Sequence, residues 1–105
     1  MHNLGCWKDS LVRAIAGGHA EILTSPETAV QVCRMRAEAM GWNIFGVLNG
    51  QQCYTSADAG DTYQKYGAGT GCTNGGGGFW RMDVYEIRCS GLHKLMEVYL
   101  HEFRI

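Results

Sequence analysis

Five widely spaced cysteines in a short chain are the feature that most constrains the fold. The chain has 105 residues, and no two cysteines form a Cys-x-x-Cys pair. Zinc sites usually offer ligands about two to four residues apart, so this spacing favours a disulfide framework. A chain of this length buries only a thin core, and its fifteen glycines favour loops, so cross-links would stabilise it substantially. The cysteines are Cys6, Cys33, Cys53, Cys72 and Cys89.

Length and charge exclude several classes of protein. The chain is long enough for one domain, residues 1–105, and its formal net charge is −1. Nucleic-acid binders usually carry a basic surplus, so we expect no nucleic-acid partner. No apolar run approaches the ~20 residues of a membrane span. The first residues do not form a secretory signal, yet the cysteines favour an extracellular, secreted protein whose signal peptide is not in this chain.

The strongest local signals predict one helix. Thr24–Glu27 offers a hydroxyl N-cap, a proline for the first turn and an acid near the positive end of the helix dipole. Gly41 provides a C-cap, which gives a helix over 26–40. Its expected core-facing stripe, at three- and four-residue spacing, is Val30, Cys33, Ala37 and Met40.

Strands are predicted on both sides of this helix. A short strand fits 3–8, and two runs rich in β-formers, 42–48 and 51–54, flank Asn49-Gly50, the strongest short-range hairpin signal. Residues 79–87 favour a further strand. Between them, 55–78 reads as a long irregular loop, while 9–23 has no clear period. We expect a helix over 92–105, with a strand as the alternative.

The ordered set of motifs is similar to one known family. Leu4–Asp9 is similar to a Gly-Cys-Tyr/Trp-x-Asp opening, and the Gly-rich run into Phe79–Tyr85 is similar to a Gly-Gly-x-x-x-Asn-Asp-Val-Tyr ending. The helix with Cys33, the hairpin with Cys53-Tyr54 and the segment from Tyr66 to Cys72 stand between them in the family's order. Over residues 4–87 the chain resembles a divergent WSC domain. The resemblance implies an α+β, PAN/apple-like extracellular module, with one main helix packed on a small antiparallel sheet.

The resemblance also implies a disulfide map. WSC domains usually carry about eight cysteines, whereas Ala37 replaces a second helix cysteine here and Cys53-Tyr54-Thr55 replaces a Cys-x-Cys. The pairs that it implies are Cys33–Cys53 and Cys6–Cys72. A bridge that closes a loop of about 20 residues stabilises by roughly 3 kcal/mol in the chain-entropy model. Cys89 lies in the C-terminal extension, 88–105, and is either a buried free thiol or an interchain link, with the Leu92–Phe103 face as the dimer contact.

The sequence around the Gly-rich run is the best candidate for a ligand site. Sugar binding requires flat aromatic faces and polar groups for the hydroxyls. The run Gly75–Gly78 would also let the backbone approach a ligand closely. The expected sugar-binding residues are Tyr63, Tyr66, Trp80, Arg81 and Asp83. As an alternative, Trp80 and Tyr85 belong to the core, which is also what we expect for Trp7 and Trp42.

These observations favour recognition over catalysis. The four histidines are scattered and have no motif with a nucleophile, so we expect no enzyme. Asp58 and Asp61 lack a third acid, which argues against a metal site, and no cofactor motif is present. The resemblance implies a carbohydrate-binding, lectin-like module with a glycan or polysaccharide partner. The alternative is a protein–protein interaction or structural module of a cell-surface or matrix assembly, adhesive and self-associating as a homodimer through its C-terminal segment.

Overall fold

The computed structural model describes residues 1–16, 20–21 and 25–88. The predicted C-terminal segment, the dimer contact assigned to it and Cys89 lie outside the described residues. The elements, in chain order, are β1 (His2–Lys8), β2 (Ala20–Glu21), α1 (Pro26–Met40), β3 (Ile44–Leu48), β4 (Gln52–Thr55), α2 (Ala59–Thr62) and β5 (Arg81–Glu86).

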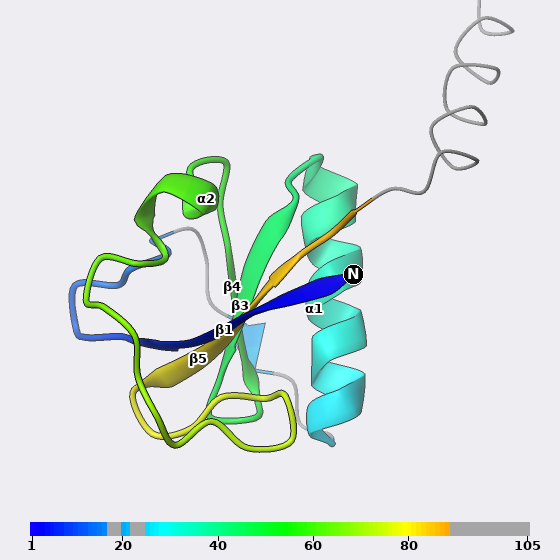
Figure 1. Ribbon diagram of the computed structural model, residues 1–105. Helices are drawn as coiled ribbons and strands as arrows, with labels where there is room; N and C mark the ends of the chain where they lie inside the picture. The colour runs from blue at the N-terminus through cyan, green and yellow to red at the C-terminus, as the bar shows by residue number, and fades with distance from the viewer. Residues whose placement is uncertain (17–19, 22–24, 89–105) are drawn as a thin grey trace, which may run out of the picture.

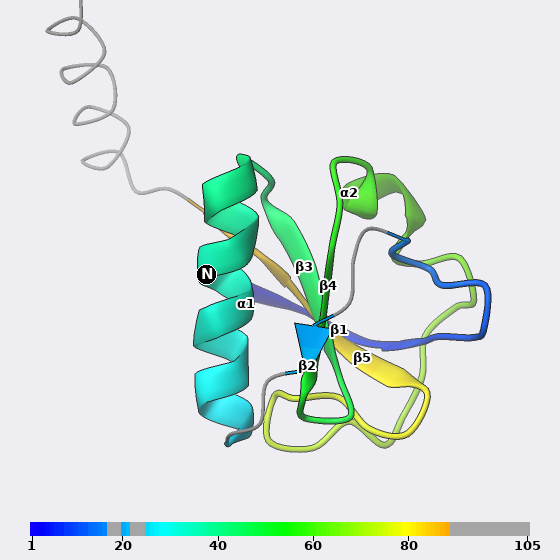
Figure 2. The same ribbon diagram turned by 180° about the vertical axis from the view of Figure 1, so that it is seen from behind.

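The strands form one antiparallel sheet with the order β1-β5-β3-β4-β2. The first and last described strands, β1 and β5, are therefore neighbours, and β5 lies between β1 and the β3–β4 hairpin. The helix α1 runs along one side of this sheet, and α2 lies on the other side together with the segment that follows β1 (Figures 1 and 2). This arrangement confirms the predicted α+β class, with one main helix packed on a small antiparallel sheet.

The helix α1 has the bounds that its caps predict. Ser25 is the N-cap, and its hydroxyl accepts a hydrogen bond from the Thr28 N–H, while Gly41 ends the helix in a left-handed conformation with φ 76°. The expected stripe is buried at Val30, Cys33 and Ala37. Met40, by contrast, is 57% exposed, because burial along α1 ends at Ala37 and no described residue packs over the last turn.

The hairpin also forms where the sequence predicts it. Asn49 and Gly50 both have positive φ, 55° and 71°, as a type I′ turn requires. The structure corrects two other expectations about the segments between these elements. The stretch 55–78 is not wholly irregular, since it contains α2, and the aperiodic stretch 9–23 contributes the two-residue strand β2, which pairs with β4.

Alternation along the strands divides the core into two clusters. We call the side of the sheet that α1 covers the helix face. There the buried residues of α1 pack with Phe45, Val47, Cys53 and Tyr85. We call the opposite side the loop face. Its cluster consists of Ile44, Leu48, Tyr54, Met82 and Val84 from the strands, with Ala14, Ile15 and Ala59 from the segments that cover them. Among the described elements, α1 thus covers one face, whereas loops and the short α2 cover the other.

Within the described residues, two disulfides cross-link the fold, and they are the pairs that the resemblance implies. Cys33–Cys53 connects α1 to β4 inside the helix face, where both side chains are buried. Cys6–Cys72 connects β1 to the long loop before β5. The same loop pairs along β1 at 67–69, because Lys8 N–H donates to the Gly67 carbonyl and Gly69 N–H to the Cys6 carbonyl, each at 3.0 Å.

Candidate functional site

A buried ion pair organises the segment that follows β1. The Asp9 carboxylate accepts one hydrogen bond from the Ala14 N–H at 2.9 Å and another from the Arg13 guanidinium at 2.8 Å. The Asp9 side chain has no exposed surface, whereas the Arg13 side chain keeps 27%. A buried carboxylate needs such partners to offset its desolvation. The pair therefore fixes the direction in which Arg13 leaves the loop.

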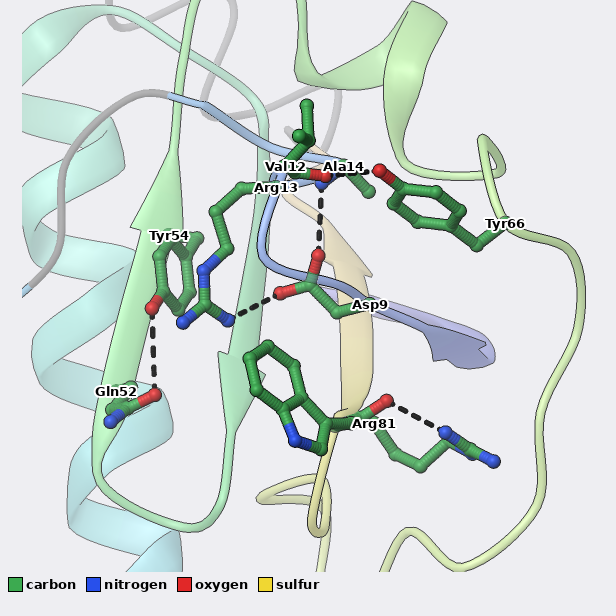
Figure 3. A network of polar contacts seen from close by, with 9 residues as sticks. Asp9, Val12, Arg13, Ala14, Gln52, Tyr54, Tyr66 and Arg81 are labelled. Carbon is green, nitrogen blue, oxygen red and sulfur yellow. Dashed lines mark hydrogen bonds and ion pairs between the residues drawn. The ribbon is translucent and has the colours of Figure 1, made fainter.

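Arg13 is held between two aromatic rings. Its guanidinium carbon lies 5.0 Å from the centre of the Tyr54 ring and 4.8 Å from that of Trp80. Figure 3 shows the Arg13 side chain beside Tyr54, with Asp9 at the other end of the dashed ion pair. Cations stack favourably on aromatic faces at these distances. We call Asp9, Arg13, Tyr54 and Trp80 the Arg13 cluster.

Burial keeps the tyrosine of the Arg13 cluster in its neutral form. Tyr54 belongs to β4 and is only 4% exposed. Burial raises the pKa of Tyr54 above its ordinary value of 10.0, while the Arg13 charge lowers this pKa and Asp9 raises it. Tyr54 therefore stays neutral at physiological pH and acts as a flat surface below the guanidinium.

Trp80 adopts a backbone conformation that is unusual for its residue type. Its φ is 54°, and the other non-glycine residues with positive φ in the described part of the chain are both asparagines. Asparagine tolerates this region, but a bulky residue there is strained. Hydrogen bonds at the turn hold this conformation: Asp9 N–H donates to the Trp80 carbonyl at 3.0 Å, and Arg81 N–H donates to the Gly78 carbonyl at 3.1 Å.

Large apolar side chains flank the Arg13 cluster on both of its segments. Leu11 and Val12 precede Arg13 and are 83% and 67% exposed. Phe79 precedes Trp80, is 80% exposed and meets the Trp80 ring edge-on at 6.0 Å between centroids. Single exposed apolar residues are common on surfaces, but these three neighbour Arg13 and Trp80 in the sequence, which makes the cluster a candidate binding site.

The two predicted tyrosines pack on the loop face, and one of them contacts the loop that carries Arg13. Tyr63 is half-buried and meets Trp7 edge-on at 5.2 Å. Tyr66 is also half-buried, and its hydroxyl donates a hydrogen bond to the Val12 carbonyl, as Figure 3 shows. Tyr66 therefore lies against the loop that carries Arg13, whereas Tyr63 supports the partly buried Trp7.

Asp83 lies on the helix face, apart from the Arg13 cluster. It is 6% exposed, and its two carboxylate oxygens accept hydrogen bonds from Gly77 N–H at 2.9 Å and Asn3 Nδ2 at 3.3 Å. Strand alternation explains this, because residues 83 and 85 of β5 point to α1, while 82 and 84 point to the loop face. Asp83 anchors the Gly-rich run, and we leave it out of the proposed ligand site.

The Gly-rich run packs against its own chain. A Cβ atom on Gly77 would come within 2.3 Å of the Val47 carbonyl oxygen and 2.4 Å of the Arg81 carbonyl oxygen. Gly50 at the hairpin turn donates a hydrogen bond to the Gly76 carbonyl, and the Tyr85 hydroxyl donates one to the Gly75 carbonyl, both at 2.6 Å. Close approach of the backbone was expected to serve a ligand. In the structure it fastens this loop to the hairpin and to β5.

Sequence reasoning placed Trp80 among the candidates but missed Arg13 and Tyr54, and it did not include Phe79. The one available signal was the spacing of Asp9 and Arg13, four residues apart, which normally indicates a helical ion pair. Here the segment is a bend, so the spacing had no helical pattern to support it.

Comparisons with known proteins add no family assignment. No protein-family model matches the chain, and no curated protein matches its sequence. Within the described residues, no three His, Cys, Asp or Glu side chains are grouped so that they could hold a metal ion. Among the helices that are described, none is both long and apolar enough to cross a membrane.

Proposed function

We propose that this chain is a non-catalytic, extracellular carbohydrate-binding module, a divergent relative of the WSC domain. The observation that carries the proposal is the strained Trp80, stacked on Arg13 beside the exposed Phe79. Such a site combines aromatic faces for the apolar side of a sugar ring with guanidinium N–H groups for its hydroxyls. The order of motifs over 4–87 and the two disulfides, which are typical of oxidising compartments, support the family and the location.

The proposed site consists of Arg13, Phe79 and Trp80. Tyr66 supports the loop that carries Arg13 through its hydrogen bond to the Val12 carbonyl. Arg13 is fixed by Asp9 and by Tyr54, so little side-chain entropy is lost when a ligand binds. Because Phe79 is 80% exposed, most of its ring is open to a sugar. The site would thus be largely formed before the ligand arrives.

Binding to neutral polysaccharides tests this proposal. We expect the protein to bind at least one of insoluble chitin, cellulose and β-1,3-glucan or soluble xylan in pull-down and calorimetric assays. Phe79→Ala should weaken this binding about tenfold without changing stability, as a lost aromatic contact of about 1 kcal/mol or more would. Met35→Ala is the matched control, since Met35 is an exposed apolar residue on α1.

Trp80 requires a paired experiment, because removing its ring also affects packing on Arg13. Trp80→Ala and Trp80→Gly should both abolish glycan binding. The glycine variant should be more stable than the alanine variant by about 1 kcal/mol, the cost of a left-handed conformation for a residue with a Cβ. Undiminished glycan binding by both variants would mean that the site lies elsewhere.

The alternative function, a protein-interaction module, is favoured by the exposed Leu11, Val12 and Phe79. Sedimentation of the whole chain separates the two proposals. If Leu11→Ser and Phe79→Ala convert a self-associated form to monomer and no polysaccharide binds, the interaction function replaces the glycan-binding one. If the chain is monomeric and binds a polysaccharide through Phe79, the glycan-binding function stands.

A further inference from the structure

Two cations lie directly opposite each other at one end of the β1–β5 pair. Lys8 of β1 and Arg81 of β5 are partners in the antiparallel register. Like charges in this position repel and destabilise a sheet. The pairing therefore needs an explanation, which a bound anion would supply.

The two side chains pass the same point on the neighbouring loop. A Cβ atom on Gly69 would lie 2.7 Å from the Arg81 Cδ and 3.2 Å from the Lys8 Cγ. The two cationic side chains thus run beside one another past Gly69. A residue larger than glycine at this position would push one of them aside.

Carbonyl groups, not carboxylates, hold the Arg81 guanidinium. Its Nε donates to the Thr70 carbonyl at 3.1 Å and its Nη1 to the Trp80 carbonyl at 2.9 Å. Figure 3 shows this side chain turned away from Arg13. These bonds orient the guanidinium but leave its charge uncompensated, and the remaining N–H groups of Nη1 and Nη2 have no partner among the described residues. The Cys6–Cys72 bridge fixes the loop that carries Thr70.

The nearest acids in the sequence are bonded to other groups. Asp9 follows Lys8 but binds Arg13 and the Ala14 N–H, and Asp83 accepts its hydrogen bonds from Gly77 and Asn3. Among the described residues, neither Lys8 nor Arg81 forms an ion pair; the three ion pairs there are made by Arg13, Arg34 and Arg88. The Lys8–Arg81 pair thus carries two charges that no described carboxylate neutralises, with the Arg81 guanidinium held in a fixed orientation.

We infer that Lys8 and Arg81 bind an anionic substituent, a carboxylate or sulfate, of an acidic polysaccharide. This inference rests on the proposed glycan-binding function and names its ligand class. Arginine presents a planar fork that matches an oxyanion, and lysine adds a flexible point charge. Arg81 follows Trp80 directly but points away from Arg13, so the pair would meet a different unit of the polysaccharide chain from the one that stacks at Trp80.

One series of polymers tests the inference, because its members share a single sugar backbone. Dextran, carboxymethyl-dextran and dextran sulfate differ in charge group, so their affinities separate the carboxylate source from the sulfate source. We expect the protein to bind at least one charged polymer about tenfold more tightly than dextran, the ratio that a charge-assisted hydrogen bond gives. Equal binding of all three would overturn the inference.

Matched variants separate a site from general attraction between opposite charges. Lys8→Gln and Arg81→Gln should each weaken binding of the charged polymer about tenfold and leave dextran binding unchanged. Arg36→Gln removes the same charge from an exposed position on α1 and should have little effect. An equal loss in Arg36→Gln would overturn the inference. Arg81 also holds the Thr70 carbonyl, so if Arg81→Gln unfolds, Lys8→Gln decides, because its side chain has no hydrogen bond among the described residues.

The outcomes distinguish this inference from the proposed function. If neutral polysaccharides bind through Phe79 and the charged polymers bind no better, only the anion site fails. If charged polymers bind through Lys8 and Arg81 while Phe79→Ala and Trp80→Ala have no effect, the aromatic site fails and the anion site stands.

Discussion

The two faces of the sheet are built in different ways. On the helix face, α1 packs on Phe45, Val47 and Tyr85, and Cys33–Cys53 joins the two layers. On the loop face, the cover is the segment after β1, the short α2 and the turn that carries Trp80. It is held by the Asp9–Arg13 ion pair and by the Tyr66 bond to the Val12 carbonyl.

The difference separates stability from recognition. The helix face hides its aromatic side chains, since Phe45 is fully buried and Tyr85 is 7% exposed. The loop face exposes part of Arg13 and most of Phe79 and keeps a strained residue at Trp80. Loops on a rigid scaffold commonly carry binding residues, because they can present side chains that a packed helix would cover.

Removing each disulfide should give the largest effects and test this division. Cys6→Ala with Cys72→Ala should cost about 4 kcal/mol of unfolding free energy, because the bridge spans a sequence separation of 66. Cys33→Ala with Cys53→Ala should cost about 3 kcal/mol, because that bridge spans a separation of 20, and it should also lose the packing of two buried sulfur atoms. Denaturant titration measures both losses. Hydrogen exchange should then show faster opening of 67–72 in the first variant, with α1 still protected. If hydrogen exchange in α1 became faster by the same factor, the two faces would unfold as one cooperative unit.

The Gly-rich run should respond strongly to a single methyl group. Gly77→Ala should cost about 3 kcal/mol or more, because the new Cβ meets two backbone carbonyl oxygens that cannot move aside easily. Gly71→Ala is the control, since Gly71 also has positive φ but nothing lies within 4 Å of the position that its new methyl group would take, and it should cost only about 1 kcal/mol. Thermal unfolding of the two variants measures the difference. Equal losses would refute the close packing of Gly77.

The smallest expected effect is a pH dependence on the helix face. Burial, with the Asp83 charge, raises the pKa of Tyr85 above 10.0, although the Asn3 hydrogen bond lowers this pKa. Below pH 10 both folded and unfolded chains keep the proton; above it the unfolded chain loses the proton first, so folding stability falls. Tyr85→Phe should cost about 1 kcal/mol at neutral pH, from the lost bond to Gly75, and should reduce this alkaline fall.

Tyr54→Phe provides the corresponding test on the loop face, because the pKa of Tyr54 is raised as well. Denaturant titrations at neutral pH and above pH 10 would compare the two variants. If neither variant reduces the alkaline loss of stability, the burial of these hydroxyls does not control it.

Much of the fold could be predicted because its signals are local. The caps of α1 and the Asn49-Gly50 turn act within a few residues, and both elements lie where the sequence puts them. The short strand β2 was not predicted because two residues are too few to show an alternating hydrophobic pattern. The helix α2 was not predicted because a single turn shows little helical periodicity. Of the candidate site, Trp80 could be named, but its stacking partner Arg13 could not.

The sequence by itself determined the fold class, the main helix, the hairpin and a chain that needs cross-links. The helix and the hairpin depend on neighbours along the chain, the need for cross-links follows from the number and spacing of cysteines, and the fold class came from the order of motifs. Only the tertiary structure decided that Trp80 stacks on Arg13, that Asp83 lies on the other face, and that the glycines serve packing. Such contacts join segments far apart in the chain, and their geometry is set by strand order and register, which no local pattern encodes.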